Sequence, residues 1–502
     1  MLSIFSKTRF AFAILFFITL KTLAQVNAVV KTDKGYINGV TENGILVFKG
    51  VPYASAPIGS LRFMPPVEHN TWNDTLQTTK FGAIATQFSN NKVVGSEDCL
   101  LLNIYTPKAD NHKRAVVVWV HGGSMTSGAG MYMNGHAFAD NDDIVTVTIN
   151  YRLGAFGFLY LGDVDKRYAE SGNNGVLDCV MALKWIKQNI AAFGGDPNRV
   201  TLMGESAGAK LISAVLVSPQ AKGLFQQYVA ESGSVQCIRD TVTAKNERAR
   251  ILKQMALSPA GAAQLLTLPA DSIMKAQGIV CAGIGGNSFF GPVYDGKVIV
   301  QDGYKYAAGN NMPPIKALIG TNESEAAAFT SPNDDLAKSN AAILRALFGD
   351  DYAPVYASYQ NLLKTNDAYG AAVKVLTQYM YQMHSYRFAR VLAQNNIPVW
   401  MFRFKYNNGK PYGAAHGDEL KFIWRNSSAF TDSAKKQIAV SMHSAWVAFI
   451  KTGDPNTATI PQWPKYNADT RQVMAFDTVS KVMSLNEVFD DKSFSSQVFL
   501  LK

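Results

Sequence analysis

The sequence predicts an α/β fold in which helices flank a central, mostly parallel β-sheet. Short β-rich runs alternate with longer helical runs along the chain, which is the pattern of strands joined by helical crossovers. Residues 115–120 and 144–149 are continuous runs of apolar or β-branched side chains bounded by turn residues. Such runs are expected of central strands that are covered on both faces. A third strand, residues 200–203, leads through a tight glycine-flanked turn into a helical segment.

Other elements continue this alternation. Residues 174–193 carry apolar side chains at helical spacing, and the Gly-Gly-Asp-Pro turn at 194–197 ends the predicted helix. Two more strand-like runs follow at 316–320 and 399–404. Both runs are followed by loops that carry ionisable side chains, so the carboxyl edge of the sheet is the expected place for chemistry.

The composition fits an ordinary folded protein. The chain has 502 residues, of which 47% are apolar and 17% charged. It can therefore bury a large core, which excludes wholesale disorder, collagen and small disulfide scaffolds. The formal net charge of +10 is mild, and basic residues form no run that would follow a phosphate backbone, so no nucleic-acid partner is expected. No repeat or low-complexity linker divides residues 25–502, which are expected to form one domain.

The first 24 residues have the layout of a signal peptide. Lys7 and Arg9 precede an apolar run at 10–20, and Thr22-Leu23-Ala24 offers a cleavage site before Gln25. An uncleaved anchor is the alternative, but the run is too short to span the hydrocarbon of a bilayer, and no later run reaches about 18 apolar residues. We therefore expect an exported protein, secreted or periplasmic, without stable membrane insertion.

The cysteines do not define a scaffold. Four cysteines in so long a chain leave their pairing open, although export permits disulfides. Cys179 falls in the predicted helix 174–193, where a buried free thiol is expected. The sequence contains no CxxC, HExxH or paired His/Cys spacing, so neither a metal site nor another cofactor is predicted.

The strongest chemical motif is the pentapeptide Gly204-Glu205-Ser206-Ala207-Gly208. A strand precedes it and a helix follows, so the turn would raise the Ser206 hydroxyl above the sheet. The strained backbone and the close helix contact require residues without side chains at the two flanking positions, which Gly204 and Gly208 provide. A structural turn with an incidental serine is the alternative. The position between strand and helix favours a nucleophile.

A serine nucleophile needs a base, and in folds with this turn the order along the chain is serine, acid, histidine. Three histidines follow Ser206. His384 and His443 lie in helix-like stretches and are expected to be structural. His416 lies in a glycine-flanked loop after the strand 399–404, where ligands bind in parallel sheets. We predict that His416 is the base.

The acid that orients the imidazole should also follow a strand. The loop after strand 316–320 carries Glu323 and Glu325, and spacing alone allows either. A local alternative exists for Glu325, because Asn322 could cap a helix whose third residue, Glu325, would reach back to the N–H of the cap.

The oxyanion of an acyl-transfer intermediate needs backbone N–H donors. Ala207, directly after the nucleophile, is the first expected donor. The turn His121-Gly122-Gly123-Ser124, directly after the strand 115–120, should supply Gly122 and Gly123, since glycines let the backbone approach closely. His121 is expected to order this loop.

Together these motifs resemble the type-B carboxylesterases, a branch of the α/β-hydrolases that includes the cholinesterases and bile-salt-activated lipase. The resemblance covers nearly all of residues 25–502. Matching segments are found at 48–54, 61–63, 97–103, 150–154, 193–197, 452–456 and 463–464. The resemblance implies an α/β-hydrolase fold and a triad of Ser206, Glu325 and His416, with oxyanion donors at Gly122, Gly123 and Ala207. It also implies two structural ion pairs, Arg62 with Glu97 and Arg152 with Asp178.

The sequence departs from this family in two places. The cysteine that resembles Cys99 usually bonds to an upstream cysteine, at a position where this chain has Ala85. Cys99 is therefore expected to be a free thiol unless it pairs elsewhere. Cholinesterases also hold a quaternary ammonium on a tryptophan just before the motif 97–99, and no tryptophan lies between Phe81 and Cys99, which disfavours choline esters.

We expect two-step acyl transfer on a small-molecule ester, through an acyl-enzyme that water hydrolyses. Phe289 and Phe290 resemble the acyl-pocket segment of the family and are candidates for an apolar pocket, with core packing as the alternative. Glu205 could tune the local field or join a hydrogen-bond network. A lipase or an amidase on the same triad is the nearest rival, and a non-catalytic adhesion protein of the same fold a more distant one. The oligomeric state is open.

Overall fold

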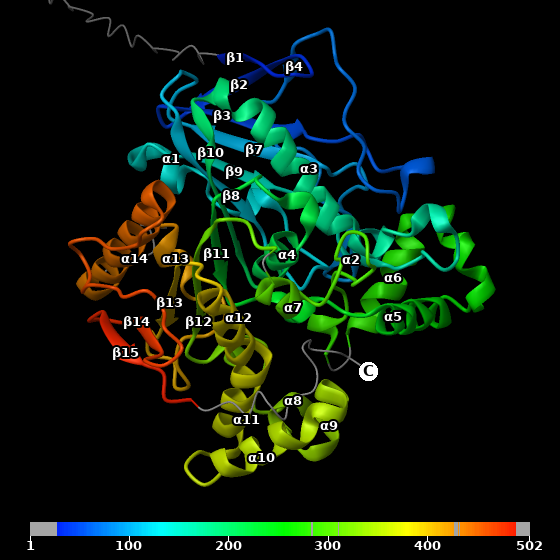
Figure 1. Cartoon of the computed structure of the whole chain (residues 1–502). Coiled ribbons are helices and arrows are strands. Elements are labelled where there is room, and N and C mark those ends of the chain that lie inside the picture. Colours follow the sequence, from blue (N-terminus) through cyan, green and yellow to red (C-terminus); the bar gives the residue numbers. More distant parts are fainter. Residues whose placement is uncertain (1–27, 283–284, 310, 426–429, 431, 488–502) are drawn as a thin grey trace, which may run out of the picture.

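The computed structural model describes residues 28–282, 285–309, 311–425, 430 and 432–487 (Figure 1). In these residues thirteen strands form one sheet, in the order β1-β2-β3-β7-β9-β8-β10-β11-β12-β13-β14-β15, with β4 beside β2. Strands β5 and β6 form a separate hairpin. The expected signal peptide, residues 1–24, lies outside the described residues.

The strands are β1 (Ala28–Lys31), β2 (Tyr36–Glu42), β3 (Ile45–Pro52), β4 (Leu76–Gln77), β5 (Gln87–Ser89), β6 (Lys92–Val94), β7 (Leu101–Thr106), β8 (Arg114–Val120), β9 (Val145–Ile149), β10 (Gly195–Glu205), β11 (Gln227–Glu231), β12 (Lys316–Asn322), β13 (Val399–Phe404), β14 (Gln472–Phe476) and β15 (Lys481–Ser484). The helices are α1 (His136–Asp142), α2 (Gly154–Phe158), α3 (Asn174–Asn189), α4 (Ala207–Leu216), α5 (Thr241–Gln254), α6 (Ala270–Cys281), α7 (Gly303–Ala308), α8 (Asp335–Lys338), α9 (Ala341–Phe348), α10 (Tyr352–Leu362), α11 (Ala368–Thr377), α12 (Met383–Gln394), α13 (Leu420–Ile423) and α14 (Ser433–Thr452).

The centre of the sheet is parallel and its edges are antiparallel. From β9 through β8, β10, β11, β12 and β13 to β14, every neighbouring pair runs parallel. Strands β1, β2, β3 and β7 continue one edge antiparallel, and β15 closes the other. The predicted α/β class with a mostly parallel sheet is confirmed. Each of the five predicted strands is found, as β8, β9, β10, β12 and β13.

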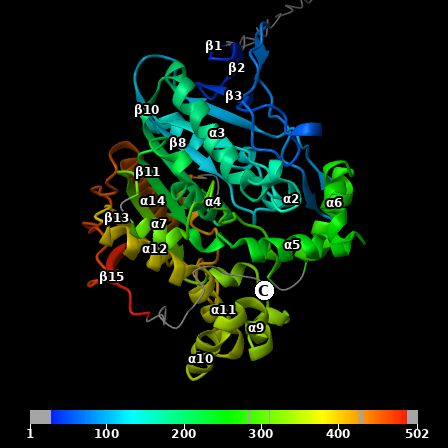
Figure 2. The same ribbon diagram turned by 45° about the vertical axis from the view of Figure 1, so that its right-hand side comes forward.

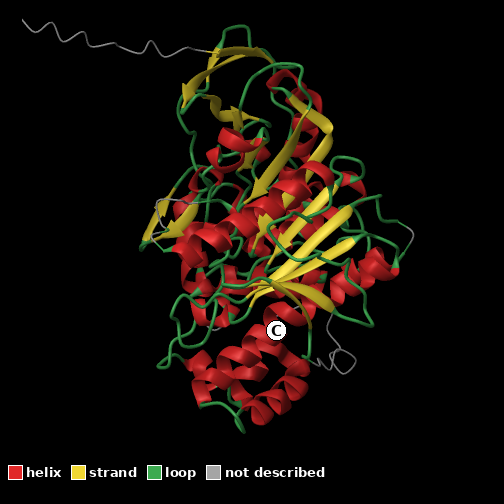
Figure 3. Ribbon diagram, turned by 90° about the vertical axis from the view of Figure 1, so that its left-hand side faces the viewer, coloured by secondary structure: helices red, strands yellow, loops and turns green. Residues whose placement is uncertain are grey.

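Helices cover both faces of this sheet (Figure 3), with α3 and α4 on one side and α14 on the other (Figure 1). Alternate residues of β8 enter different cores. Val116, Val118 and Val120 pack with α3 and α4, whereas Val117 and Trp119 pack with α14. A strand buried on both faces must be apolar throughout, which explains the continuous apolar run at residues 115–120 that predicted β8.

Helices α8 to α11 form a small group of their own beside the main body (Figure 2). They share a separate apolar core that includes Leu344, Leu347, Val355 and Leu376. The segment that carries this group leaves the sheet after β12 and returns through α12 to β13. It is thus an insertion between the two strands whose following loops were predicted to supply the acid and the base.

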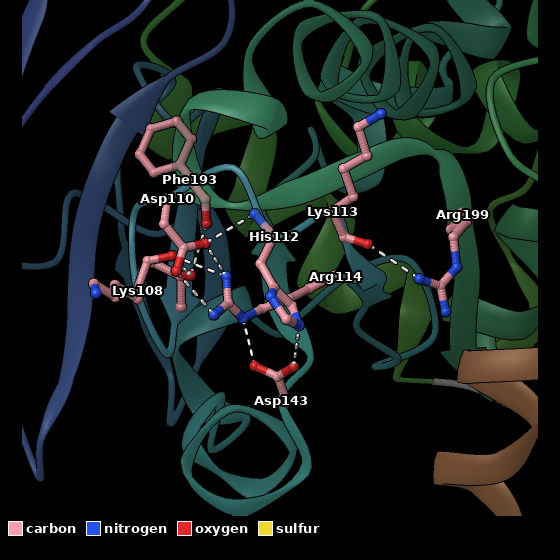
Figure 4. Close-up of polar contacts among 9 residues, drawn as sticks. Lys108, Asp110, His112, Lys113, Arg114, Asp143, Phe193 and Arg199 are labelled. Carbon is pink, nitrogen blue, oxygen red and sulfur yellow. Dashed lines mark hydrogen bonds and ion pairs between the residues drawn. The ribbon is translucent and has the colours of Figure 1, made fainter.

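Charged side chains fix the amino-terminal end of β8 (Figure 4). The predicted site lies at the other, carboxyl, ends of the parallel strands. The buried guanidinium of Arg114 donates to Asp110 in the preceding loop and, at 2.5 Å, to Asp143 after α1. Arg199 of β10 donates to the carbonyl oxygen of Lys113 at 3.0 Å. These contacts tie two neighbouring strands to their connections.

Both ion pairs implied by the family resemblance are present. Arg62 lies 2.5 Å from Glu97, and the fully buried Arg152 lies 2.6 Å from Asp178. In the described part of the chain, no helix is long and apolar enough to cross a membrane.

The cysteines are all free, as expected for Cys99. Cys99 and Ala85 are both buried and line one small cavity. Cys179 lies buried in α3, as the sequence predicted.

Candidate active site

A strained turn joins β10 to α4 at Ser206. The residue has φ 55° and ψ −120°, values that a side chain makes unfavourable. A Cβ at Gly204 would lie 2.7 Å from the carbonyl carbon of Gly208, and a Cβ at Gly208 would lie 2.1 Å from the carbonyl oxygen of Val120. Both flanking glycines are therefore required by close backbone contacts. The Ser206 N–H donates to the carbonyl oxygen of Glu231, at the end of the neighbouring strand β11, at 2.8 Å.

His416 meets Glu325 above the ends of β12 and β13. Nδ1 of His416 lies 2.6 Å from Oε2 of Glu325, which is completely buried. The loops that carry them are joined by the backbone, since Ser324 N–H donates to the carbonyl oxygen of Ala414 at 2.9 Å. A carboxylate beside Nδ1 keeps the proton on that nitrogen and leaves Nε2 available as an acceptor.

The second oxygen of Glu325 holds the acid in place. Oε1 accepts from the Ser232 hydroxyl at 2.6 Å and from the Asn322 N–H at 2.7 Å. The contact with Asn322 is the one considered as a local alternative for Glu325. It coexists with the histidine contact, because the two oxygens face different groups. The helix from residue 323 that this alternative required is not formed, because β12 continues to Asn322 and a 3₁₀ turn spans Glu325–Ala328.

Glu323 has a different environment. Its carboxylate is about one-third exposed and lies 3.1 Å from Arg403 and 3.2 Å from Lys405. These cations outweigh the effect of burial and lower the pKa of Glu323. The ion pairs turn its side chain toward β13, and Glu323 makes no contact with His416 among the described residues.

The other ring nitrogen of His416 faces Glu205. Nε2 lies 3.2 Å from Oε1 of Glu205, and no hydrogen bond joins Ser206 to His416 in the described structure. Burial lowers the pKa of His416, but the carboxylates of Glu205 and Glu325 outweigh this effect and raise it to about 9. Burial likewise raises the pKa of Glu205, although His416 opposes that shift. Glu205 is therefore an electrostatic partner of the imidazole.

The glycine turn after β8 lies against the serine turn. A Cβ at Gly122 would lie 3.2 Å from Cβ of Ser206, and Gly123 has φ +106° with Ser127 O in the way of any side chain. Helix α4 begins at Ala207, whose N–H is one of the first-turn donors without an acceptor inside the helix. The three expected oxyanion donors thus come from segments that border Ser206.

His121 has contacts that order this turn. Its Nδ1 lies 2.8 Å from the carbonyl oxygen of Gly122, and its ring stacks on Tyr151 at 4.5 Å between centroids. Burial lowers the pKa of His121 to about 4, so its ring is neutral at pH 7. His384 in α12 and His443 in α14 are buried within helices, as predicted.

A small cavity borders Ala207. Phe290 lines it, whereas Phe289 does not and packs edge-to-face against Phe290 at 4.9 Å. Two basic side chains, Lys210 and Arg239, also line it, and no sequence motif indicated a role for either of them. The available signal was a lysine one helical turn after the nucleophile, the one charged residue of α4.

The order of the sheet and the serine turn after β10 are those of the α/β-hydrolase fold. The chain matches the model of the carboxylesterase family over residues 26–492. It is 34% identical over 479 residues to para-nitrobenzyl esterase of Bacillus subtilis (strain 168), with 90% of this chain and 96% of that protein covered. The fumonisin B1 esterase of Sphingopyxis macrogoltabida is 30% identical over 466 residues, which cover 87% and 84%.

Solved structures agree with these relatives. A carboxylesterase crystal structure from Geobacillus stearothermophilus superposes with a TM-score of 0.84 at 34% identity, covering 93% of this chain and all of that one. The chain belongs to the carboxylesterase family, and by class it is a carboxylic ester hydrolase.

Proposed function

We propose that this protein is an exported serine carboxylesterase that uses Ser206, His416 and Glu325 as its triad. The observation that carries the proposal is the 2.6 Å contact between Nδ1 of His416 and the buried carboxylate of Glu325. It lies at the carboxyl ends of parallel strands, next to the serine in the strained turn. A histidine with its proton fixed on Nδ1 presents Nε2 as the base that a serine needs.

The first half of the reaction is acylation. Nε2 of His416 takes the hydroxyl proton as Oγ of Ser206 attacks the ester carbonyl, and the N–H groups of Gly122, Gly123 and Ala207 stabilise the oxyanion. The tetrahedral intermediate collapses, the bond to the alcohol oxygen breaks, and His416 returns the proton to the alcohol. In the free protein Nε2 faces Glu205, so the serine–histidine hydrogen bond forms in the substrate complex, as apo enzymes often require.

The second half is deacylation. Water attacks the acyl-enzyme, His416 takes its proton, and the same donors hold the second oxyanion. The bond to Oγ then breaks, Ser206 regains its proton and the acid leaves. One water is consumed for each ester, and no cofactor takes part.

A series of 4-nitrophenyl esters of graded chain length, with a matched 4-nitroanilide, tests this function. Ester hydrolysis should exceed anilide hydrolysis, and Ser206→Ala should abolish it, while Ser272→Ala, an exposed serine in α6, should not. An organophosphonate should label Ser206. Wild-type rates in Ser206→Ala would end the proposal, and a preference for the anilide or for long acyl chains would favour an amidase or a lipase.

Export is supported by the basic and apolar pattern of residues 1–24. Amino-terminal sequencing of the extracytoplasmic protein should begin at Gln25. Recovery of an amino terminus at Met1 in that fraction would contradict cleavage.

A further inference from the structure

The cavity beside Ala207 has a basic lining. Lys210 and Arg239 both line it, and no acidic side chain does among the described residues. The remaining lining combines polar side chains with Met125, Ala207, Phe290 and Met380. A basic lining is unexpected for a pocket that would receive a plain hydrocarbon acyl chain, because a hydrocarbon offers buried cations no hydrogen bond.

Lys210 lies close to the reacting groups. It follows Ser206 by one turn of α4, and its backbone N–H donates to the carbonyl oxygen of Ser206 at 2.9 Å. Its Nζ lies 5.1 Å from the ring centroid of Tyr381, whose ring is 4.8 Å from the imidazole of His416. Among the described residues, Nζ of Lys210 has no hydrogen bond and no ion pair.

Arg239 has an unused donor. Its side chain is 1% exposed, with Nε 2.9 Å from Glu247 and Nη2 donating to the carbonyl oxygen of Ser288 at 2.7 Å. Within the described structure, Nη1 has no hydrogen-bond partner. Glu247 does not line the cavity, and burial raises its pKa to about 7, so it balances the Arg239 charge only in part.

We propose that Lys210 and Arg239 form a carboxylate-binding subsite, and that the preferred substrates are monoesters of short dicarboxylic acids. Ala207, a proposed oxyanion donor, lines the cavity, and so does Phe290, in the segment that resembles the acyl pocket of the family. The cavity has a volume of about 10 Å³, enough for one water, so it must widen to admit the carboxylate. The free carboxylate of such an acid would accept from Nζ of Lys210 and Nη1 of Arg239 while the ester carbonyl occupies the oxyanion site. The inference rests on the proposed esterase function and names its substrate class.

The chemistry of hydrolysis is unchanged by this subsite. The ester bond is cleaved with one water, and the second carboxylate keeps its charge throughout. Its contact with two cations away from bulk water would favour it over a neutral group, since charge-assisted hydrogen bonds are the stronger ones.

A structural role is the alternative for Lys210. Burial lowers the pKa of Lys210, and the carboxylates of Glu205 and Glu325 oppose that shift, so its charge could serve only to balance them. Such a role would affect all esters equally. The two roles are therefore separated by comparing substrates that differ only in charge.

The test uses the benzyl monoesters of succinic and adipic acid, each paired with the neutral analogue in which the free carboxylate is a primary amide. Benzyl alcohol release gives kcat/KM for each. The wild-type enzyme should prefer one or both acids over the paired amide by about tenfold or more. Lys210→Met should lower this ratio by about tenfold, Lys210→Arg should retain most of it, and Lys184→Met, an exposed lysine of α3, should retain all of it.

Equal kcat/KM for acid and amide in the wild-type enzyme, or an unchanged ratio in Lys210→Met, would overturn the subsite. If Lys210→Met does not fold, the subsite is tested by inhibition of the wild-type enzyme with free carboxylic acids. Free dicarboxylates should inhibit the hydrolysis of 4-nitrophenyl acetate more strongly than monocarboxylates of the same length, and equal inhibition would refute the proposal. If the carboxylate subsite is refuted, hydrolysis of 4-nitrophenyl acetate that depends on Ser206 would still support the proposed esterase function.

Discussion

Glu325 uses its two oxygens for two tasks. Oε2 contacts the imidazole of His416, and Oε1 is held by Ser232 and by the N–H of Asn322. An acid that is fixed on one side and contacts the base on the other can orient the ring without moving. Glu323, two residues earlier, is instead fixed by Arg403 and Lys405.

We expect Glu325→Gln to lower kcat by roughly four orders of magnitude, as loss of the orienting carboxylate does in comparable triads. The matched control is Glu323→Gln, which removes ion pairs on a partly exposed carboxylate. It should keep kcat within a few-fold and lower the melting temperature slightly. Steady-state kinetics and thermal melts of both variants check this. A Glu325→Gln enzyme with kcat within tenfold of wild type would exclude Glu325 as the acid.

Glu205 should set the pH dependence of the reaction. The general base must be neutral, and the carboxylates of Glu205 and Glu325 raise the pKa of His416 to about 9. The acidic limb of kcat/KM should therefore lie above the ordinary histidine value near 6.5, with activity rising as pH rises through it.

Glu205→Gln removes one of those carboxylates, so the limb should move to lower pH. Profiles of kcat/KM between pH 5 and 10 measure this, with the exposed Glu68→Gln as the control. A midpoint that stays in place or moves upward in Glu205→Gln would show that Glu205 does not act on His416.

At the scale of elements, the site depends on the packing of α4 against the end of β8. A Cβ at Gly208 would lie 2.1 Å from the carbonyl oxygen of Val120, and neither backbone can yield easily. Gly208→Ala should therefore displace α4, lower stability by about 1–3 kcal/mol and reduce kcat sharply. At Gly261, by contrast, the nearest atom to an added Cβ is the end of the Gln264 side chain at 3.4 Å.

Gly261→Ala is thus the matched control and should be nearly neutral in both measurements. Urea unfolding gives the stability and 4-nitrophenyl acetate hydrolysis gives kcat. If Gly208→Ala retained wild-type stability and activity, the close approach of helix and strand would not be needed for the site.

The sequence predicts well those elements whose pattern of apolar and polar residues follows directly from how the element itself is buried. Residues 115–120 are apolar because β8 is covered on both faces. His416 could be predicted because it lies in the loop after β13, at the carboxyl end of a parallel strand. The choice between Glu323 and Glu325 needed the family resemblance, since spacing allowed both.

Contacts between distant segments could not be predicted in this way. Arg239 follows β11, whereas Lys210 lies in α4, and no local pattern says that both line one cavity. Nor does spacing indicate that Nε2 of His416 faces Glu205 in the free protein. These facts depend on side-chain directions, which the tertiary packing decides.

At the scale of the whole molecule, stability rests on apolar packing and buried ion pairs and not on disulfides. The four cysteines are free, and Cys99, Cys179 and Cys237 are buried. Burial raises the thiol pKa of Cys237 to about 11 and of Cys281 to about 12, and raises those of Cys99 and Cys179 further. Such thiols are poor nucleophiles, because the thiolate is the reactive form.

We therefore expect the folded protein to resist alkylation by iodoacetamide at pH 8, and the protein in denaturant to be labelled at all four cysteines without prior reduction. The melting temperature should not change on addition of dithiothreitol. The measurement is the mass increase of intact protein, with and without denaturant. A disulfide at Cys99 would appear as two missing labels in the unreduced, denatured sample and as a melting temperature that falls with reductant. Because Ala85 and Cys99 line the same small cavity, Ala85→Cys tests whether a bridge to Cys99 can form there, and such a bridge would remove two labels.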